Sequence, residues 1–273
     1  MSVPQSALLK PPEHALAWRE SRALLDAGRM VLPLLMPAGN ARTERARHII
    51  VLPGFGAGDR ALWPLRRYLR KLGHHAEGWG LGVNRAGIDI RHTLADISPG
   101  WSAEPIAHYR NEGSVPMLCD RMVARVRERH LALGGTPITL IGWSLGGVVA
   151  REAARDLPGM VEEVITLGTP VQGGPKYTRA AAFFRGRGMD LDWIERGVAR
   201  RESTPIRARI TAIASPTDAV VGHAATRDHH SPDVRHIDVD AAHLGLVFNP
   251  TVWALIARAL NGEPLPQGLN MAP

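Results

Sequence analysis

The stretch Gly142-Trp143-Ser144-Leu145-Gly146 constrains the fold of this chain most, because of the segments on either side of it. Residues 137–141 are apolar and include β-branched side chains, which predicts a buried strand. Residues 147–155 have a helical pattern that ends before Pro158-Gly159. A serine on a sharp strand-to-helix turn needs small neighbours, because the backbone is strained there and larger side chains would clash. Such a turn holds the hydroxyl beside a helix N-terminus, where developing negative charge is stabilised.

The rest of the chain alternates between strand and helix patterns, which favours a largely parallel sheet covered by helices on both faces. An amphipathic helix is predicted for residues 13–28, and an edge strand for residues 30–35 because of Pro33. Asp59 is a candidate helix cap. The other predicted strands cover residues 48–52, 75–80, 161–167, 209–214 and 234–239, and the other predicted helices cover residues 59–72, 116–133 and 251–260.

Two connections are longer than such alternating units need. With 273 residues the chain suits a single domain, residues 1–273, that carries a lid. Long excursions on the catalytic side of a sheet usually form lids or substrate walls. We therefore expect residues 171–207 to form a lid or cap insertion, and residues 84–115 to form a second excursion near the site.

A serine hydroxyl becomes a good nucleophile only when a base takes its proton and a carboxylate orients that base. In an open parallel sheet, the catalytic loops follow the carboxyl ends of the strands. Asp218 follows the predicted strand 209–214, and His243 follows the predicted strand 234–239. The chain order of serine, acid and histidine matches this sheet topology. Ser144, Asp218 and His243 are thus the predicted catalytic residues.

Other residues could take the places of Asp218 and His243 beside Ser144. Asp218 could simply be a turn residue in Ser-Pro-Thr-Asp, and Asp240 could replace it as the acid. The run Asp228-His229-His230 could indicate a metal, but it lacks further ligands at useful spacing, so we expect a solvated loop and no metal. The histidines that compete with His243 are His223, His229, His230 and His236.

An oxyanion hole needs two backbone N–H donors. One is expected from Leu145, directly after the serine. The second is expected from Phe55, because Gly54 lets the loop after strand 48–52 turn toward the serine. Aromatic side chains are candidates for the substrate wall, although those in the lid segment could equally form helix core. The predicted substrate-binding residues are Trp143, Phe183, Phe184 and Trp193.

Over about residues 48–262, the chain resembles the α/β-hydrolase superfamily. The resemblance rests on Pro53-Gly54-Phe55-Gly56, the Gly-Trp-Ser-Leu-Gly turn, and residues 164–170, whose Leu-Gly-Thr-Pro ending is similar to bacterial lipases and esterases. Residues 79–84 are similar to a segment of uncharacterised bacterial hydrolases. The chain departs from the family where Pro-Gly replaces His-Gly before Phe55, and where residues 171–174 read Val-Gln-Gly-Gly. The resemblance implies an α/β-hydrolase fold with a small cap.

Composition excludes several other classes. The net charge is +7, but the 33 basic residues are scattered among acids without interleaved aromatics, so no nucleic-acid partner is expected. Residues 1–12 lack a signal-peptide pattern and no apolar run could span a bilayer, which predicts a cytoplasmic protein without stable membrane insertion. The single cysteine, Cys119, cannot form an internal disulfide and is expected to be buried.

Three functions remain at this point. The first is a serine esterase or lipase-like hydrolase that acts on a small-molecule ester with a moderately apolar acyl group and needs no cofactor. The second keeps the same three residues for acyl transfer, or for thioester, lactone or perhydrolase chemistry. The third is a non-catalytic binding module on the same fold. The sequence leaves the oligomeric state open.

Overall fold

The computed structural model describes residues 9–12, 20, 43, 45–101 and 104–266. The helix predicted for residues 13–28 falls outside these residues apart from Glu20, and the strand predicted for residues 30–35 lies wholly outside them. In the described part of the chain, no helix combines the length and apolar character that crossing a bilayer requires.

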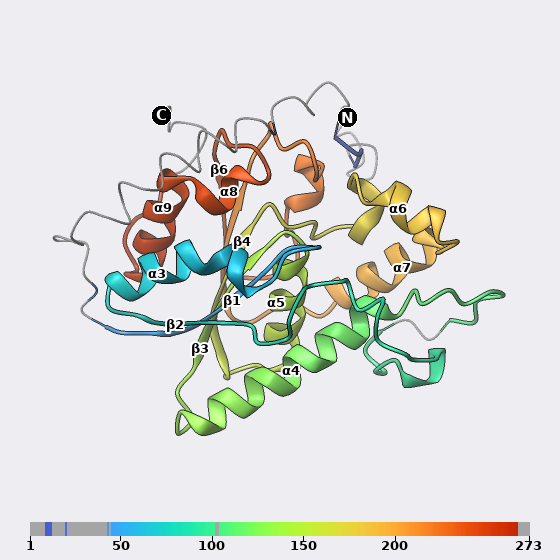
Figure 1. The fold of residues 1–273 in the computed structure, drawn as a ribbon, viewed down its shortest axis with the longest axis horizontal. Coiled ribbons are helices and arrows are strands. Elements are labelled where there is room, and N and C mark those ends of the chain that lie inside the picture. Colours follow the sequence, from blue (N-terminus) through green and yellow to red (C-terminus); the bar gives the residue numbers. More distant parts are fainter. Residues whose placement is uncertain (1–8, 13–19, 21–42, 44, 102–103, 267–273) are drawn as a thin grey trace.

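A six-stranded sheet forms the centre of the molecule, with the order β2-β1-β3-β4-β5-β6 (Figure 1). Every pair of neighbouring strands is parallel. The predicted parallel α/β architecture is therefore confirmed. The strands are β1 (His48–Leu52), β2 (His75–Gly78), β3 (Ile138–Trp143), β4 (Val161–Leu167), β5 (Arg209–Ala214) and β6 (Val234–Asp238).

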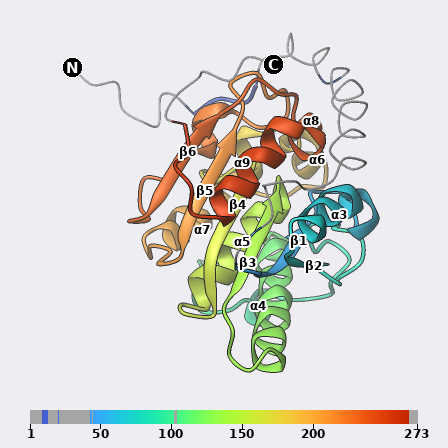
Figure 2. The same ribbon diagram turned by 90° about the vertical axis from the view of Figure 1, so that its left-hand side faces the viewer.

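Helices cover both faces of this sheet (Figure 2). In β1, Ile49 and Val51 pack with α3, α8 and α9 on one face, while Ile50 and Leu52 pack with α4 and α5 on the other. Because both faces are buried, β1 is apolar at consecutive positions from Ile49 to Leu52. The helices are α3 (Trp63–Lys71), α4 (Ser114–Ala132), α5 (Leu145–Asp156), α6 (Ala181–Gly186), α7 (Leu191–Glu202), α8 (Gly245–Phe248) and α9 (Pro250–Leu260).

The predicted helix 59–72 is divided into a 3-10 turn, η4 (Asp59–Leu62), and α3. Asp59 does not cap this segment: the N-cap is Gly58, without a side-chain hydrogen bond. The Asp59 carboxylate instead accepts from the N–H groups of Trp79 (3.0 Å) and Gly80 (3.2 Å). The cap prediction is wrong because the free amides after β2 compete for the same carboxylate.

The two long connections, residues 84–115 and 171–207, lie against each other (Figure 1). Glu112 is 3% exposed, and its Oε1 accepts from the backbone N–H of Asp190 at 3.0 Å. The indole Nε1–H of Trp193 donates to the backbone oxygen of Glu104 at 3.1 Å. Both excursions therefore contribute to a layer that α6 and α7 build beyond the sheet.

Candidate active site

Ser144 stands at the turn between β3 and α5 with φ +54° and ψ −124°. A non-glycine residue in this region is strained by about 1–3 kcal/mol and persists only when its surroundings hold it. The Ser144 N–H donates to the Leu167 oxygen at 2.8 Å, and the Ser144 carbonyl accepts from Thr169 Oγ1 at 3.1 Å. The end of β4 thus fixes the strained turn.

The glycines around Ser144 are required by close backbone contacts. A Cβ on Gly142 would lie 2.4 Å from Gly147 Cα, and a Cβ on Gly146 would lie 2.4 Å from the Leu52 carbonyl oxygen. At distances this short, a side chain would fit only if the backbone moved. The turn therefore tolerates only glycine at both positions, as the sequence pattern predicts.

Asp218 and His243 form a buried pair at the carboxyl ends of β5 and β6. Each residue is 3% exposed, and Asp218 Oδ2 lies 2.6 Å from His243 Nδ1. Asp218 Oδ1 accepts from the N–H groups of Val220 (2.7 Å) and Val221 (2.8 Å). Because a carboxylate can only accept, we assign the imidazole proton to Nδ1, which leaves a lone pair on Nε2. In that tautomer, Nε2 is able to accept a proton.

The competing histidines have other surroundings. His223 Nε2 lies 2.8 Å from Asp238 Oδ1, and His236 Nε2 accepts from the Asp228 N–H at 3.0 Å. His229 and His230 are exposed.

Asp240, the competing acid, accepts a hydrogen bond from Thr217 Oγ1 at 2.9 Å. It is exposed, whereas Asp218 is buried against the imidazole of His243. Of the two acids, Asp218 is therefore the one in position to orient His243.

The expectation of a solvated loop at residues 228–230 is wrong for Asp228, which is 4% exposed. Burial alone would raise its pKa. However, Arg151 at 2.9 Å and the N–H groups of Ser231 and His230 outweigh burial and hold the Asp228 pKa below its usual value. Within the described residues, no cluster of three or more potential metal ligands occurs.

The loop after β1 approaches Ser144 closely. A Cβ on Gly54 would lie 3.1 Å from Ser144 Cβ, so glycine permits the approach. Asn84 is 0% exposed; its Nδ2 donates to the Pro53 carbonyl at 2.7 Å, and its backbone carbonyl accepts from the Gly56 N–H at 2.8 Å. Asn84 thereby holds the loop that carries Phe55. Sequence reasoning missed this role, although Asn84 ends the glycine-containing segment 79–84.

A second residue that sequence reasoning missed is Glu20. Its carboxylate oxygens accept from the backbone N–H groups of His243 (3.0 Å) and Leu244 (3.2 Å). Glu20 lies over 200 residues earlier in the chain, so no local pattern could indicate this contact.

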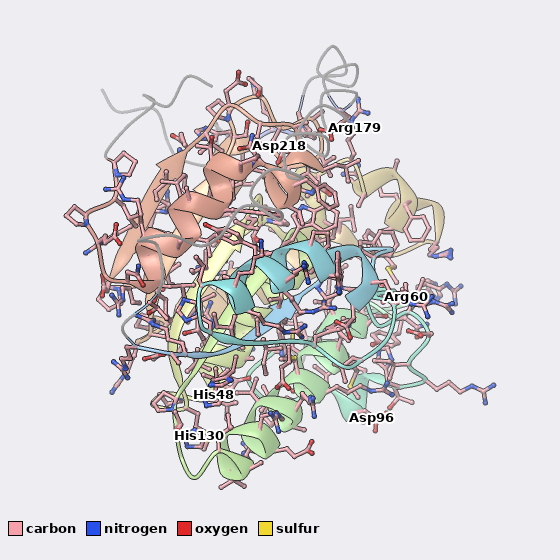
Figure 3. The ribbon with its side chains drawn as sticks, turned by 60° about the vertical axis from the view of Figure 1, so that its left-hand side comes forward. His48, Arg60, Asp96, His130, Arg179 and Asp218 are labelled. Carbon is pink, nitrogen blue, oxygen red and sulfur yellow. The ribbon has the colours of Figure 1, made fainter. Side chains whose placement is uncertain are left out.

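A cavity of about 260 Å³ opens at the carboxyl edge of the sheet, and both Ser144 and His243 line it. Phe55 and Leu145, the predicted oxyanion-hole residues, line it as well. Figure 3 shows Asp218 near this end of the molecule and His48, which begins β1, toward the opposite end. The predicted catalytic residues therefore meet at one edge, as expected for loops that follow parallel strands.

Three of the four predicted substrate-binding residues, Trp143, Phe184 and Trp193, line the cavity. The lining, taken over the described residues, does not include Phe183. That ring is 39% exposed and packs 5.4 Å from the ring of Phe55, with the Arg187 guanidinium 4.3 Å from its centre.

No protein-family model matches this chain. Among solved structures, an α/β hydrolase from the sediment metagenome of the Mar Chica lagoon, Morocco, aligns with a TM-score of 0.52 and 14% identity, over 80% of this chain and 91% of that one. A structure reported for the metagenome-derived lipolytic enzymes LipS and LipT aligns with a TM-score of 0.53 and 13% identity, over 80% and 94%.

A sequence relative from rice, the transmembrane and coiled-coil domain-containing protein STS1 of Oryza sativa subsp. japonica, is 32% identical over 140 residues. The match covers 44% of this chain but only 21% of the rice protein. Together with the sheet order, the structural likenesses show that the chain has the α/β-hydrolase fold.

Proposed function

We propose that this protein is a serine hydrolase that cleaves carboxylic esters with moderately apolar acyl groups through an acyl-enzyme. The observation that carries the proposal is the buried Asp218–His243 pair, whose imidazole borders the same apolar cavity as the strained Ser144. A strained serine and an oriented base that line one cavity are the groups that nucleophilic acyl transfer needs.

In the proposed reaction, His243 Nε2 takes the proton of Ser144 Oγ as that oxygen attacks the ester carbonyl. The resulting oxyanion accepts from the backbone N–H groups of Leu145 and Phe55, a donor pair worth a few kcal/mol of barrier. Collapse expels the alcohol, which receives the proton from His243. Water then attacks the acyl-enzyme with His243 again as base, and Asp218 stabilises the imidazolium in both halves. These steps need no cofactor.

We further propose that residues 171–207 act as a cap over the acyl group, with residues 84–115 as its support. Phe184 and Trp193 from the first segment line the cavity. The hydrogen bond between Glu112 and Asp190 ties the two segments together. A cap of this kind excludes water from the acyl chain while the mouth admits the leaving alcohol.

The test is active-site labelling combined with ester hydrolysis. A fluorophosphonate probe should label the parent protein at Ser144, and p-nitrophenyl butyrate should be hydrolysed at a rate that Ser144→Ala lowers by at least about 10³-fold. A parent that is neither labelled nor active, or a Ser144→Ala variant that equals the parent, would contradict the proposal. Adding alcohol or thiol acceptors separates hydrolysis, which yields free acid alone, from acyl transfer.

A further inference from the structure

The apolar cavity follows one face of α5. Leu145 and Val148 line the cavity, and Val148, Arg151 and Glu152 line a smaller pocket of about 20 Å³. Residues three and four apart lie on the same side of a helix. These four side chains thus form a row that starts beside Ser144 and leads away from it.

The mouth and the inner end of the cavity differ in exposure. Phe55 and Leu244 line the cavity and are 39% and 44% exposed, so they mark its rim. Trp101 and Val198 line both the cavity and the smaller pocket, as Val148 does, and so mark the inner end. An acyl group on Ser144 that avoids water must therefore extend toward the inner end.

At its inner end, the cavity is closed by charged side chains that form ion pairs with one another. Arg151 Nη2 lies 2.9 Å from Asp228 Oδ2 and 3.2 Å from Glu202 Oε2. Arg201 Nε lies 2.6 Å from Glu152 Oε2. These groups are buried, and a methyl group pushed among them would separate charges that have no access to water. Burial of an alkyl chain is therefore favourable only as far as these ion pairs.

The distance along α5 from Ser144 to Arg151 and Glu152 limits the length of the acyl chain. A helix rises about 1.5 Å per residue, so Arg151 and Glu152 stand about 10–12 Å beyond Ser144 along α5. Carbon–carbon bonds of about 1.5 Å at tetrahedral angles advance an extended chain by about 1.3 Å per carbon. About eight or nine carbons therefore span the distance.

The volume gives a similar limit. A cavity of about 150 Å³ holds benzene, which has six carbons. By the same packing, a cavity of about 260 Å³ holds about ten carbons. The helix rise and the cavity volume, two separate estimates, both give a limit of about ten carbons or fewer.

The geometry points to a substrate class: esters of unbranched, apolar acyl groups of about six to ten carbons, with the chain laid along α5 and its end near Arg151. This inference rests on the proposed ester hydrolysis at Ser144.

The experiment measures kcat/KM for p-nitrophenyl esters from C2 to C16 with the parent protein. Each methylene up to about C8 should raise kcat/KM by up to about fourfold through burial, and values should fall at C12 and beyond. Val148→Phe and Val198→Phe block the row from opposite walls, and each should lower the C8-to-C2 ratio at least tenfold. Val83→Phe makes the same change at a side chain that is 50% exposed, and should keep the parental profile.

The outcomes separate this inference from the proposed function. A parent that hydrolyses no ester and takes no fluorophosphonate contradicts the function itself. A parent that is labelled and active but prefers C2 or C16, or whose profile neither blocking variant alters while both variants melt like the parent, contradicts only the acyl-length inference. A blocking variant that does not fold leaves the other one to decide.

Discussion

Asp218 carries two tasks with one carboxylate. Oδ1 closes the turn through the N–H groups of Val220 and Val221, and Oδ2 orients the His243 imidazole. The turn role and the proposed catalytic role, which are alternatives when only the sequence is considered, are compatible because each oxygen faces a different partner.

Asp218→Asn separates these tasks. The amide oxygen can still accept from Val220 and Val221, so the fold is kept. The amide NH₂ then faces His243 Nδ1, which must become an acceptor, so Nε2 carries the proton and cannot take one from Ser144. We expect kcat to fall by about 10³–10⁴ with little change in melting temperature. Asp240→Asn, the same change at an exposed neighbouring acid, should keep parental activity; equal losses in both variants would argue against the assigned roles.

At the scale of elements, the central strands are readily predicted and the helix ends are not. Residues 48–52 match β1 because a strand buried on both faces leaves consecutive apolar residues, here Ile49 to Leu52. Helix α5 begins at Leu145, although the prediction starts it at residue 147. Glycines are poor helix formers, but a Cβ on Gly147 would lie 1.9 Å from Thr169 Oγ1. The start of α5 is therefore set by the packing of Gly147 against Thr169 and not by local helix propensity.

The site shows the same division. The shared position of Ser144, Asp218 and His243 is predictable because parallel strands end at one edge. Asn84 and Glu20 are not, since their partners lie far away in the chain and depend on the finished fold.

The buried ion pairs between α5 and α7 lead to a prediction about the free energy of unfolding. Arg151 is 2% exposed, and its removal in Arg151→Met leaves the buried Asp228 without its cationic partner, while Glu202 keeps only Arg155. Breaking such a pair costs about 3–5 kcal/mol, which urea denaturation can measure. Arg196→Met removes an exposed pair with Glu104 and should cost less than about 1 kcal/mol. A smaller loss in Arg151→Met than in Arg196→Met would refute this view of the ion pairs.

The environment of His74, directly before β2, leads to a prediction about how the free energy of unfolding depends on pH. Its Nδ1 accepts from the Arg47 N–H, and burial, followed by the charges of Arg47 and His75, lowers the His74 pKa to about 4. Between pH 6.5 and 4, the unfolded chain therefore binds a proton that the folded chain does not. Stability should fall by about 2 kcal/mol from pH 7 to pH 4.5 because of this residue. In His74→Gln, urea denaturation should show a smaller decrease over that interval; an identical decrease would exclude His74 as its source.

For the molecule as a whole, the cavity lies between two layers that also touch through an apolar cluster around Phe184 and Leu191 and through ion pairs between α5 and α7. Trp143 belongs to the sheet, whereas Phe184 and Trp193 belong to the layer of α6 and α7, and all three line the cavity. A covalently held acyl analogue therefore contacts both layers, and its alkyl chain is removed from water only in the folded state, which stabilises that state.

An octyl fluorophosphonate should consequently raise the melting temperature by at least about 5 °C more than a methyl one, since 1 kcal/mol corresponds to about 2–4 °C for a chain of this size. Differential scanning calorimetry of the two adducts measures this difference. Ser144→Ala, treated in the same way, serves as the control and should show no shift. Equal shifts for the two adducts would mean that the alkyl chain stays outside the cavity.

The amino edge of the all-parallel sheet lies at the opposite end of the strands from Ser144 and the cavity. The turn between α4 and β3 lies there, at the bottom of Figure 1, far from α6 and α8. Gly134 and Gly135 in this turn are exposed and have positive φ angles of 63° and 84°. New chain termini or an inserted affinity peptide at this point should disturb neither Ser144 nor the layer of α6 and α7. The turn thus offers a place to tether the protein to a support with its cavity facing the solution.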